Sequence, residues 1–271
     1  MNISTPSAQA IELLCQLIET PRISREETEA AQILFGHMKD VCKLDVRRHG
    51  NNLWAITPHF SSQKPTLLLN AHIDTVKPVS GWKKDPWKAT LEGDCLYGLG
   101  SNDDGASLVT LLYAFIELSG KQQPYNLVFL ASAEEEVSGK DGIESVLSLL
   151  PHIDVAIVGE PTCMQPAIAE KGLMVLDVTA HGTSGHAARE EGDNAIYHAM
   201  DDMQWFRTHK WPLVSNFLGP VKMTVTIVNS GTQHNVIPDT CTFTVDIRSN
   251  ECYTNHELYE KICTHVKGEV K

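Results

Sequence analysis

The sequence lacks the features that would direct a protein to a membrane, a nucleic acid or a secretory route. It has no apolar stretch of about 18 residues, so we expect no transmembrane helix. Basic residues are few: 22 Lys and Arg against 34 Asp and Glu give a formal charge of −12, which argues against attraction to nucleic acid or anionic lipid. The first ten residues, MNISTPSAQA, contain no basic segment followed by an apolar one, so we expect no secretory signal.

The cysteines form no C-x-x-C pair and are odd in number. The seven are Cys15, Cys42, Cys95, Cys163, Cys241, Cys252 and Cys263. Scattered thiols of this kind are typical of a reducing compartment and do not indicate a disulfide framework or a thiolate zinc site. The sequence therefore predicts a cytoplasmic protein.

The 271 residues are enough for two domains, and the pattern of apolar residues changes near residue 170. Before it, helices are predicted at 7–20, 24–40, 105–120 and 141–150, and strands at 43–48, 52–57, 66–71, 125–133 and 154–160. Ser24 and Glu27 have the spacing of a capping box for the second helix. Strands that alternate with helices predict an α/β domain with a mainly parallel sheet over residues 1–170.

The second part, residues 171–271, has alternating rather than fully apolar strands. The predicted order is a strand at 173–182, a helix at 194–210, strands at 221–231 and 241–250, and a helix at 255–268. This β-α-β-β-α order predicts a ferredoxin-like α+β sandwich. One more strand would close such a sandwich, and we expect it to be absent before residue 271.

Polar residues gather where the apolar strands of the first domain end. They are one imidazole and several carboxylates: His72 and Asp74, Asp103 and Asp104, Glu134 to Glu136, and Glu160. The carboxyl ends of the strands are where open α/β sheets bind ligands. Four separate loops are therefore expected to bring these side chains to one edge of the sheet.

Carboxylates packed this closely repel one another and need a countercharge. No Lys or Arg occurs in the four loop motifs, so a divalent metal is the expected countercharge. A mixed set of His and carboxylates suits zinc, with cobalt or manganese as substitutes. We predict that His72 is a metal ligand and that Asp74 holds its imidazole in the required tautomer.

Each motif alone also has an ordinary explanation. His72 could be a satisfied strand end, Glu134 to Glu136 a solvated turn, Glu160 part of a proline turn, and Asp104 or Asn102 a helix N-cap. Their joint occurrence at strand-to-helix junctions on one predicted edge favours the metal interpretation.

Six ordered motifs resemble those of the two-zinc amidohydrolases. They are NAHIDTV, LYGLGSNDDGAS, ASAEEEVSG, VGEPT, HGTSGHAA and TQHNVIPD with DIR. That family includes acetylornithine deacetylase, succinyl-diaminopimelate desuccinylase, aminoacylase and carboxypeptidase G, and the likeness is greatest to acetylornithine deacetylase-like proteins of the Bacteroides group. The resemblance implies a catalytic zinc-hydrolase domain over 1–170 and a lid and dimerisation domain over 171–271.

The resemblance also implies roles for the clustered residues. His72 and Glu160 would bind one zinc, Asp103 would bridge both zincs, and Glu136 would bind the second. Glu135 would be the general base. Asp74 would support His72. Family members often have Asp where this chain has Glu134, a change expected to be tolerated because that position is not a ligand.

Three residues of the second domain match lid positions of the family. His186 resembles a histidine that reaches into the partner subunit's site and stabilises the oxyanion, which implies a homodimer. Asn235 and Arg248 resemble substrate-binding residues, Arg248 through a carboxylate. The ordinary alternatives are a polar residue in a Gly-rich turn for His186 and a strand-end salt bridge for Arg248.

The implied reaction is hydrolysis of the amide bond of an N-acyl amino acid, with N-acetylornithine of arginine biosynthesis as the first expected substrate. A desuccinylase or a dipeptidase is the alternative within the family. The family also has a later segment with a His that completes the second zinc site, and no His here matches it. We therefore expect both domains to be truncated at the C-terminus and the Glu136 site to lack one ligand. An inactive metal-binding or dimerising remnant is the alternative of another class.

Overall fold

A computed structural model describes residues 5–189 and 191–271. The chain divides into two compact units, Met1–Gln165 and Pro166–Lys271. Each unit has a hydrophobic core of its own. Within the described residues, the helices are too short or too polar to cross a membrane.

The first unit is built on a five-stranded mixed sheet in the order β1-β2-β6-β3-β7. These strands are β1 (Val46–His49), β2 (Asn52–Ile56), β3 (Thr66–His72), β6 (Asn126–Ser132) and β7 (Val155–Val158). β3 runs parallel to both β6 and β7, whereas β1 and β2 pair antiparallel. The α/β fold with parallel central strands that the sequence predicts is confirmed.

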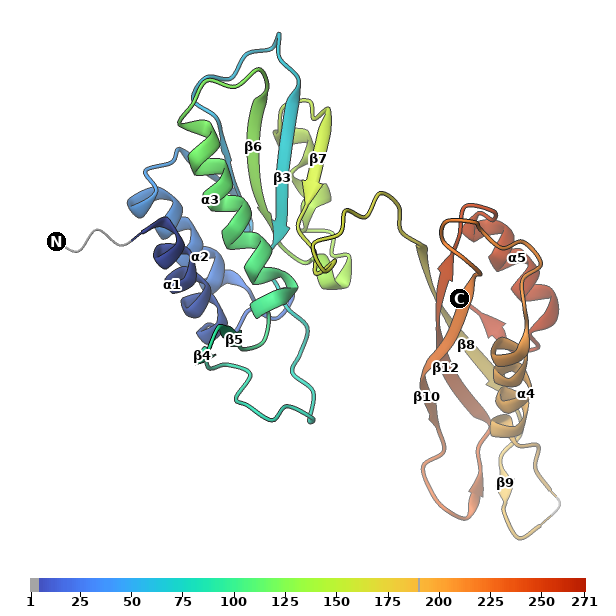
Figure 1. Cartoon of the computed structure of the whole chain (residues 1–271). Helices are drawn as coiled ribbons and strands as arrows, with labels where there is room; N and C mark the ends of the chain where they lie inside the picture. The colour runs from blue at the N-terminus through green and yellow to red at the C-terminus, as the bar shows by residue number, and fades with distance from the viewer. Residues whose placement is uncertain (1–4, 190) are drawn as a thin grey trace. The chain divides into compact units, whose positions relative to one another are not determined.

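Helices α1 (Pro6–Glu19), α2 (Thr28–Gly36) and α3 (Ser107–Ser119) cover one face of this sheet (Figure 1). Alternate residues of β3 and β6 point to opposite faces, as the two-residue period of a strand requires. Leu69 and Phe129 belong to the core beneath the helices. Leu68 and Val128 belong to a smaller core that Val146 closes from the other face.

Two predicted helices differ from the structure. The helix predicted at 24–40 begins only at Thr28, without a side-chain cap at Glu27, because residues 23–24 bond to the loop after β3: the Ser24 amide donates to the Thr75 carbonyl. The helix predicted at 141–150 is a pair of 3₁₀ turns, Ile143–Ser145 and Leu147–Leu149. There the Ser145 hydroxyl donates to the Gly142 carbonyl, a local bond that competes with regular helix.

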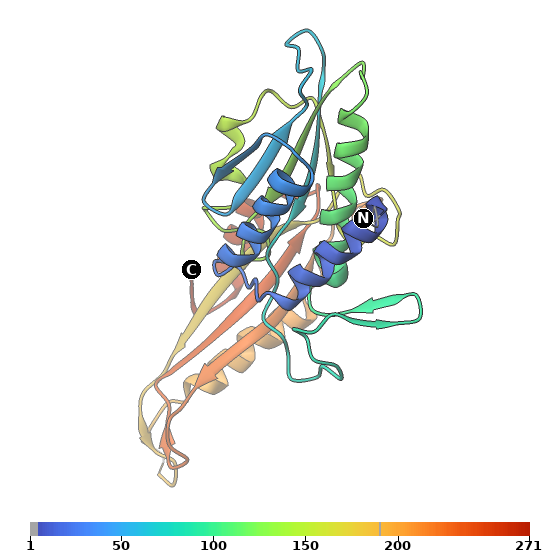
Figure 2. The ribbon, with the colours of Figure 1, turned by 90° about the vertical axis from the view of Figure 1, so that its left-hand side faces the viewer.

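The long segment between β3 and α3 contains a short hairpin of β4 (Thr90–Glu92) and β5 (Cys95–Tyr97), which projects from the first unit in Figure 2. It then passes through a distorted helical turn, Ser101–Ala106, directly before α3. This turn carries Asp103 and Asp104 to the end of the sheet.

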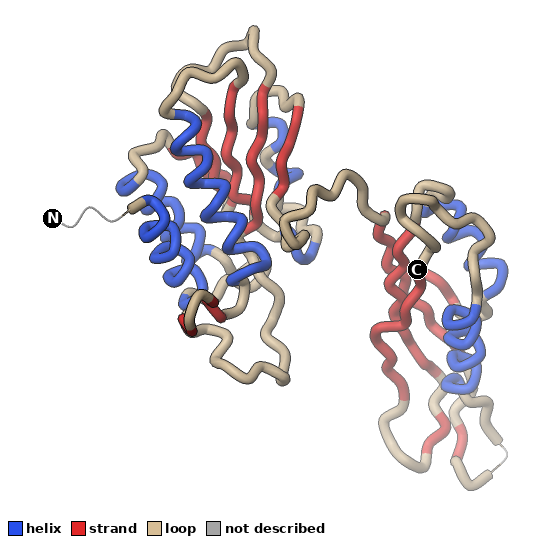
Figure 3. Tube along the Cα trace, in the orientation of Figure 1, coloured by secondary structure: helices blue, strands red, loops and turns tan. Residues whose placement is uncertain are grey.

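The second unit is a four-stranded antiparallel sheet with two helices on one face (Figure 3). Its elements are β8 (Gly172–His181), α4 (Ala195–Thr208), β10 (Lys222–Ser230), β12 (Thr240–Ser249), α5 (Asn255–His265) and β13 (Glu269–Val270), with the strand order β10-β12-β8-β13. This is the predicted ferredoxin-like arrangement. The sequence predicted no fourth strand, and the structure has a two-residue one, β13, paired with β8.

Candidate metal centre

The polar residues singled out in the sequence lie at the carboxyl ends of three neighbouring strands. In the parallel register, His72 at the end of β3 is level with Ser132 at the end of β6, and Asn70 is level with Val158 of β7. The chain continues from β6 into Glu134–Glu136 and from β7 into Glu160. The strand register therefore brings these three segments to one edge, and the turn before α3 adds Asp103.

The structure brings five of the predicted residues together. Nε2 of His72 lies 3.0 Å from Oδ1 of Asp103 and 3.9 Å from Oε2 of Glu135. Two groups have potential ligand atoms within 4.8 Å of one another: His72, Asp103 and Glu136, and His72, Glu135 and Glu160. The imidazole is common to both groups, so His72 is the centre of the cluster.

Asp74 supports the other side of the imidazole from a fully buried position. Its Oδ1 lies 3.5 Å from Nδ1 of His72, and the same nitrogen is 3.0 Å from its backbone carbonyl. The carboxylate also accepts hydrogen bonds from the Ser24 hydroxyl at 2.6 Å and from the amides of Glu135 and Glu136 at 3.0 and 3.2 Å. Asp74 thus connects the loops after β3 and β6 and directs Nε2 of His72 toward the carboxylates.

The two buried residues of the centre, His72 and Asp74, have shifted pKa values that favour their charged forms. Burial lowers the pKa of His72, but the hydrogen bond and charge of Asp74, together with Asp104 and Glu135, outweigh it and raise that pKa to about 9. Burial raises the pKa of Asp74, whereas hydrogen bonds from His72, Ser24 and the Glu135 amide outweigh burial and leave it below its ordinary value. In the metal-free protein His72 is therefore an imidazolium beside carboxylates.

Three other carboxyl groups of the centre differ from Asp74, because their pKa values are raised. Desolvation and neighbouring carboxylates, opposed by His72, raise the pKa of Glu160 to about 7, although this residue remains exposed. Desolvation and the charge of Asp103 raise the pKa of Glu136 as well. Buried Asp104, which accepts a hydrogen bond from the His72 amide, has its pKa raised to about 6, chiefly by burial. Desolvation is the largest cause in each case, and the neighbouring negative charge adds to it.

The donor set fits a divalent ion. Zinc lies about 2.0–2.2 Å from nitrogen and carboxylate ligands, so two atoms that share an ion are separated by roughly 3–4.4 Å. The contacts of Nε2 of His72 fall in that range, and the remaining atoms of both groups are close to it. The cluster has four carboxyl groups against one imidazole, so a divalent cation would offset the repulsion among the carboxylates. Both the geometry and the charge therefore suit a metal.

Sequence reasoning missed Arg22, gave Ser24 a different role, and named Asp104 without a supporting role. Arg22 is fully buried and donates to the carbonyls of Ile73 and Gly100. Ser24 was assigned to a capping box, and its hydroxyl instead bonds to Asp74. Asp104 is buried under His72. No local sequence pattern marks Arg22 or Ser24 as part of the centre, because both contact residues about 50 positions away or more in the sequence.

Glu134 also departs from an ordinary turn residue. It has a positive φ of 54°, is 8% exposed, and its carboxylate lies 3.8 Å from Nε of Arg25. It belongs to neither group of potential ligands.

The three predicted lid residues lie in the second unit. His186 in β9 (Gly185–His186) pairs with Val236 of β11 (Val236–Ile237), and the Ala187 amide donates to the Asn235 carbonyl, so the His186 and Asn235 segments are adjacent. Arg248 of β12 binds Asp246 through two bonds of 2.9 and 3.1 Å, which matches the salt-bridge alternative. Arg248 lies eight residues along β12 from Thr240, the first residue of the strand. The rise of an extended strand therefore places Arg248 roughly 26 Å from the end of the sheet at Thr240.

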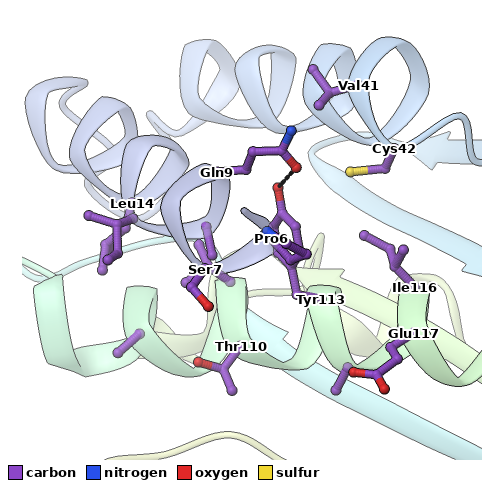
Figure 4. Close-up of a pocket in the computed structure, with 15 residues that line it drawn as sticks. Pro6, Ser7, Gln9, Leu14, Val41, Cys42, Thr110, Tyr113, Ile116 and Glu117 are labelled. Carbon is purple, nitrogen blue, oxygen red and sulfur yellow. Dashed lines mark hydrogen bonds between the residues drawn. The ribbon is translucent and has the colours of Figure 1, made fainter. Parts of the chain in front are cut away.

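A separate cavity of about 860 Å³ lies between α1, α3 and the turn at residues 37–41 (Figure 4). Its lining is mostly apolar, and within it Tyr113 bonds to Gln9. None of the clustered acidic residues lines it. The cavity is therefore not part of the candidate centre.

Two family models match the chain. The model described as peptidase family M28 matches residues 52–150, and the one described as peptidase dimerisation domain matches residues 168–271. A curated relative, succinyl-diaminopimelate desuccinylase 2 of Ruegeria sp. (strain TM1040), is 27% identical, and the match covers 98% of this chain and 72% of the relative.

Solved structures share the fold. An M20 family metallo-carboxypeptidase, Sso-CP2 from Sulfolobus solfataricus, matches with a TM-score of 0.73 and 18% identity over 97% of this chain and 77% of its own. The di-peptidase Dug1p from Saccharomyces cerevisiae matches with a TM-score of 0.69 and 14% identity over 98% and 76%. The solved structures show the fold of the chain, and the two models and the curated relative support a relationship to metal-dependent amidohydrolases and peptidases.

Proposed function

We propose that this chain hydrolyses the amide bond of an N-acyl amino acid at a zinc centre held by the first unit. The observation that supports the proposal most is the convergence of His72 with four carboxylates from three further segments, in two overlapping groups. We assign residues 1–170 to a catalytic domain and residues 171–271 to a lid and dimerisation domain.

The proposed ligands divide between two ions. His72 and Glu160 would hold one, Glu136 the other, and Asp103 would be shared between them. When bound, such ions supply a water of lowered pKa and positive charge for the oxygen of the amide carbonyl. Asp74 acts on the opposite side of the ring, where it keeps the proton on Nδ1 and leaves Nε2 free as a ligand atom.

Glu135 is proposed as the proton carrier. Its carboxylate is about half exposed and lies on the same side of His72 as Asp103, so it can reach a water that enters the cluster. It would accept a proton from the attacking water and donate it to the amine nitrogen as the C–N bond breaks. The products are then a carboxylic acid and a free amino acid.

The second unit is proposed to complete the site in a homodimer. His186 would donate a hydrogen bond to the developing oxyanion in the partner subunit's site, and the adjacent Asn235 would contact the substrate. Arg248 would bind a substrate carboxylate, for which it must exchange one of its bonds to Asp246. The match to a peptidase dimerisation domain supports this arrangement.

N-acetylornithine is the first substrate we propose, on the resemblance of the six motifs. An N-succinyl amino acid is the second, because the curated relative is a succinyl-diaminopimelate desuccinylase. A dipeptide is the third, because Dug1p is described as a di-peptidase. The inactive remnant is the competing hypothesis: it predicts that all three remain intact.

The test is a substrate panel with matched variants. We expect release of amine from one of the three substrates by the zinc-loaded chain, and a loss of about 10²–10⁴-fold in kcat for Glu135→Gln, since proton transfer of this kind contributes that much. Glu144→Gln, in the exposed 3₁₀ turn, is the control and should retain activity. Unchanged turnover in Glu135→Gln would remove Glu135 from the mechanism, and an intact panel would favour the remnant.

A further inference from the structure

Arg22 differs from the other cationic side chains of the described residues. It is the one Lys or Arg among residues 5–189 and 191–271 that is buried, at 0% exposure. It lies in the loop between α1 and α2, outside every motif of the metal centre. Burial lowers the pKa of Arg22, and the charges of Asp74, Asp104 and Asp103 oppose it only in part, so that the pKa is about 10. The guanidinium is therefore a cation at neutral pH.

The guanidinium joins the two segments that carry the proposed ligands. Nη1 donates to the carbonyl of Ile73, which stands between His72 and Asp74. Nη2 donates to the carbonyl of Gly100 at 2.8 Å, and Gly100 directly precedes the turn that contains Asp103. A planar fork of two donors therefore spans the end of β3 and the start of the Asp103 turn.

The backbone around Arg22 strengthens this connection. Its carbonyl accepts from the Thr75 amide at 2.9 Å, and the Thr75 carbonyl accepts from the Ser24 amide at 3.2 Å. The Ser24 hydroxyl in turn bonds to Asp74. Residues 22–24 thus hold the loop after β3 through the backbone, and the Arg22 side chain extends the same contact to Gly100.

The Arg22 guanidinium packs closely against Gly100 and Gly105, the glycines at the two ends of the Asp103 turn. Gly100 has a φ of +71°, and a Cβ there would lie 2.4 Å from Nη2 of Arg22. A Cβ on Gly105, at the other end of the Asp103 turn, would lie 3.0 Å from the same atom and 2.4 Å from the Gly100 carbonyl. The guanidinium therefore fills the space between the glycines that flank the Asp103 turn.

We propose that Arg22 is a positioning residue that fixes the His72–Asp74 segment and the Asp103 turn relative to each other, so that the ligand atoms are arranged before a metal binds. The metal part of this inference rests on the proposed function. The claim that Arg22 holds the two loops together does not depend on the proposed function, because it concerns the metal-free chain. Lysine at this position keeps the charge but lacks the two-pronged donor, so Arg22→Lys separates positioning from charge.

The first experiment is amide hydrogen exchange on the metal-free chain. In Arg22→Lys we expect exchange about tenfold faster in the segments 72–76 and 99–106, because a single ammonium group cannot replace the two guanidinium bonds that join these segments. Exchange in 240–249, in the other unit, should stay unchanged. Arg48→Lys is the matched control, since Arg48 also donates to a backbone carbonyl, that of Gly50, away from the centre. It should leave both segments as in the wild type.

The second experiment is a cobalt titration of the same proteins, followed by the visible absorption of the bound ion. We expect the dissociation constant of Arg22→Lys to rise roughly 10- to 100-fold, the usual effect of losing a residue that orients metal ligands, with a changed absorption band. Arg48→Lys should bind like the wild type.

The exchange result decides the proposal. Unchanged exchange in both segments, or equally faster exchange over the whole chain, would overturn it. So would failure of both Arg22→Lys and Arg22→Gln to fold, because a positioning residue should leave the fold intact. If the wild type binds no cobalt while the two segments still loosen in Arg22→Lys, the positioning role stands and the proposed metal function fails.

Discussion

The buried and exposed sides of the candidate centre differ in how far solvent reaches them. His72 and Asp74 are 2% and 0% exposed, and the Asp74 carboxylate receives bonds from a hydroxyl and two amides. Asp103 and Glu135 are each about half exposed, and Glu160 is exposed as well. The hydrogen bonds of Asp74 hold the buried side in place, whereas the exposed side is a group of carboxylates around Nε2 of His72.

This difference separates two tasks of the site. The buried side orients the imidazole and costs desolvation, which its hydrogen bonds offset. The exposed side has excess negative charge, which a cation would neutralise. Changes on the buried side should therefore affect folding and metal binding together, and changes on the exposed side should affect metal binding more than folding.

The largest effect is expected for Asp74→Ala. The substitution leaves the Ser24 hydroxyl and the amides of Glu135 and Glu136 without their acceptor, and it removes the carboxylate that lies 3.5 Å from Nδ1 of His72. We expect a loss of about 3–5 kcal/mol in the free energy of unfolding, the usual cost of breaking a buried charged network. Urea denaturation measures it, with Asp94→Ala on the exposed β4–β5 turn as the control. A loss as small as that of the control would mean that the buried side is not held by Asp74.

A smaller effect is expected for Ser24→Ala. The variant removes one hydrogen bond of 2.6 Å to the Asp74 carboxylate and leaves the backbone bonds of Ser24 and Thr75 in place. A bond to a charged group contributes about 1.5–3 kcal/mol. Urea denaturation should show a loss in this range, and exposed Ser62→Ala should show none. A full loss of the Asp74→Ala size would indicate that Ser24 supports more than the carboxylate.

A further effect concerns the pH dependence of stability in the metal-free protein. The folded-state pKa values of Glu160 and Asp104, about 7 and about 6, exceed their ordinary values of 4.5 and 3.8, so the folded chain binds more protons and loses stability as pH rises through about 4 to 7. His72, raised from 6.5 to about 9, adds stability that is complete below pH 6.5 and is lost through pH 9.

The melting temperature in EDTA should therefore decrease from pH 5.5 to 9. Asp74 has the opposite sign, but its pKa lies below 3.8 and acts outside this range. Burial lowers the pKa of His37 and His209 from 6.5, so these two also have the opposite sign, and the comparison of variants below isolates the centre from them. Glu160→Gln should flatten the acidic part of the curve, and Glu144→Gln should not. A melting temperature that rises with pH would contradict the proton balance described for the centre.

The sequence predicted the parts of the molecule that depend on local pattern. The apolar runs at 66–71 and 125–133 are β3 and β6, and the polar residues after them meet because parallel strands end level with each other. The roles assigned to the cluster remain predictions. So do the partner-site role of His186, the zinc identity of the metal and the cytoplasmic location.

The sequence could not predict what depends on contacts between distant residues. Ser24 and Glu27 have capping-box spacing, but the bond from Ser24 to Asp74 shows that a contact across 50 positions determined the local structure. Arg22 was overlooked because its partners are carbonyls, which any residue supplies. No Lys or Arg occurs in the four loop motifs, yet the charges of Asp74, Asp104 and Asp103 act on the Arg22 guanidinium and raise its pKa.

The central claim is that the edge of the sheet beyond β3, β6 and β7 holds zinc through His72. The most direct test is zinc per chain by elemental analysis after dialysis, in the wild type, in His72→Ala and in His152→Ala, whose imidazole is 88% exposed. We expect the wild type and His152→Ala to retain zinc to the same level, and His72→Ala to retain little. Equal zinc in all three proteins, or none in the wild type, would contradict the account.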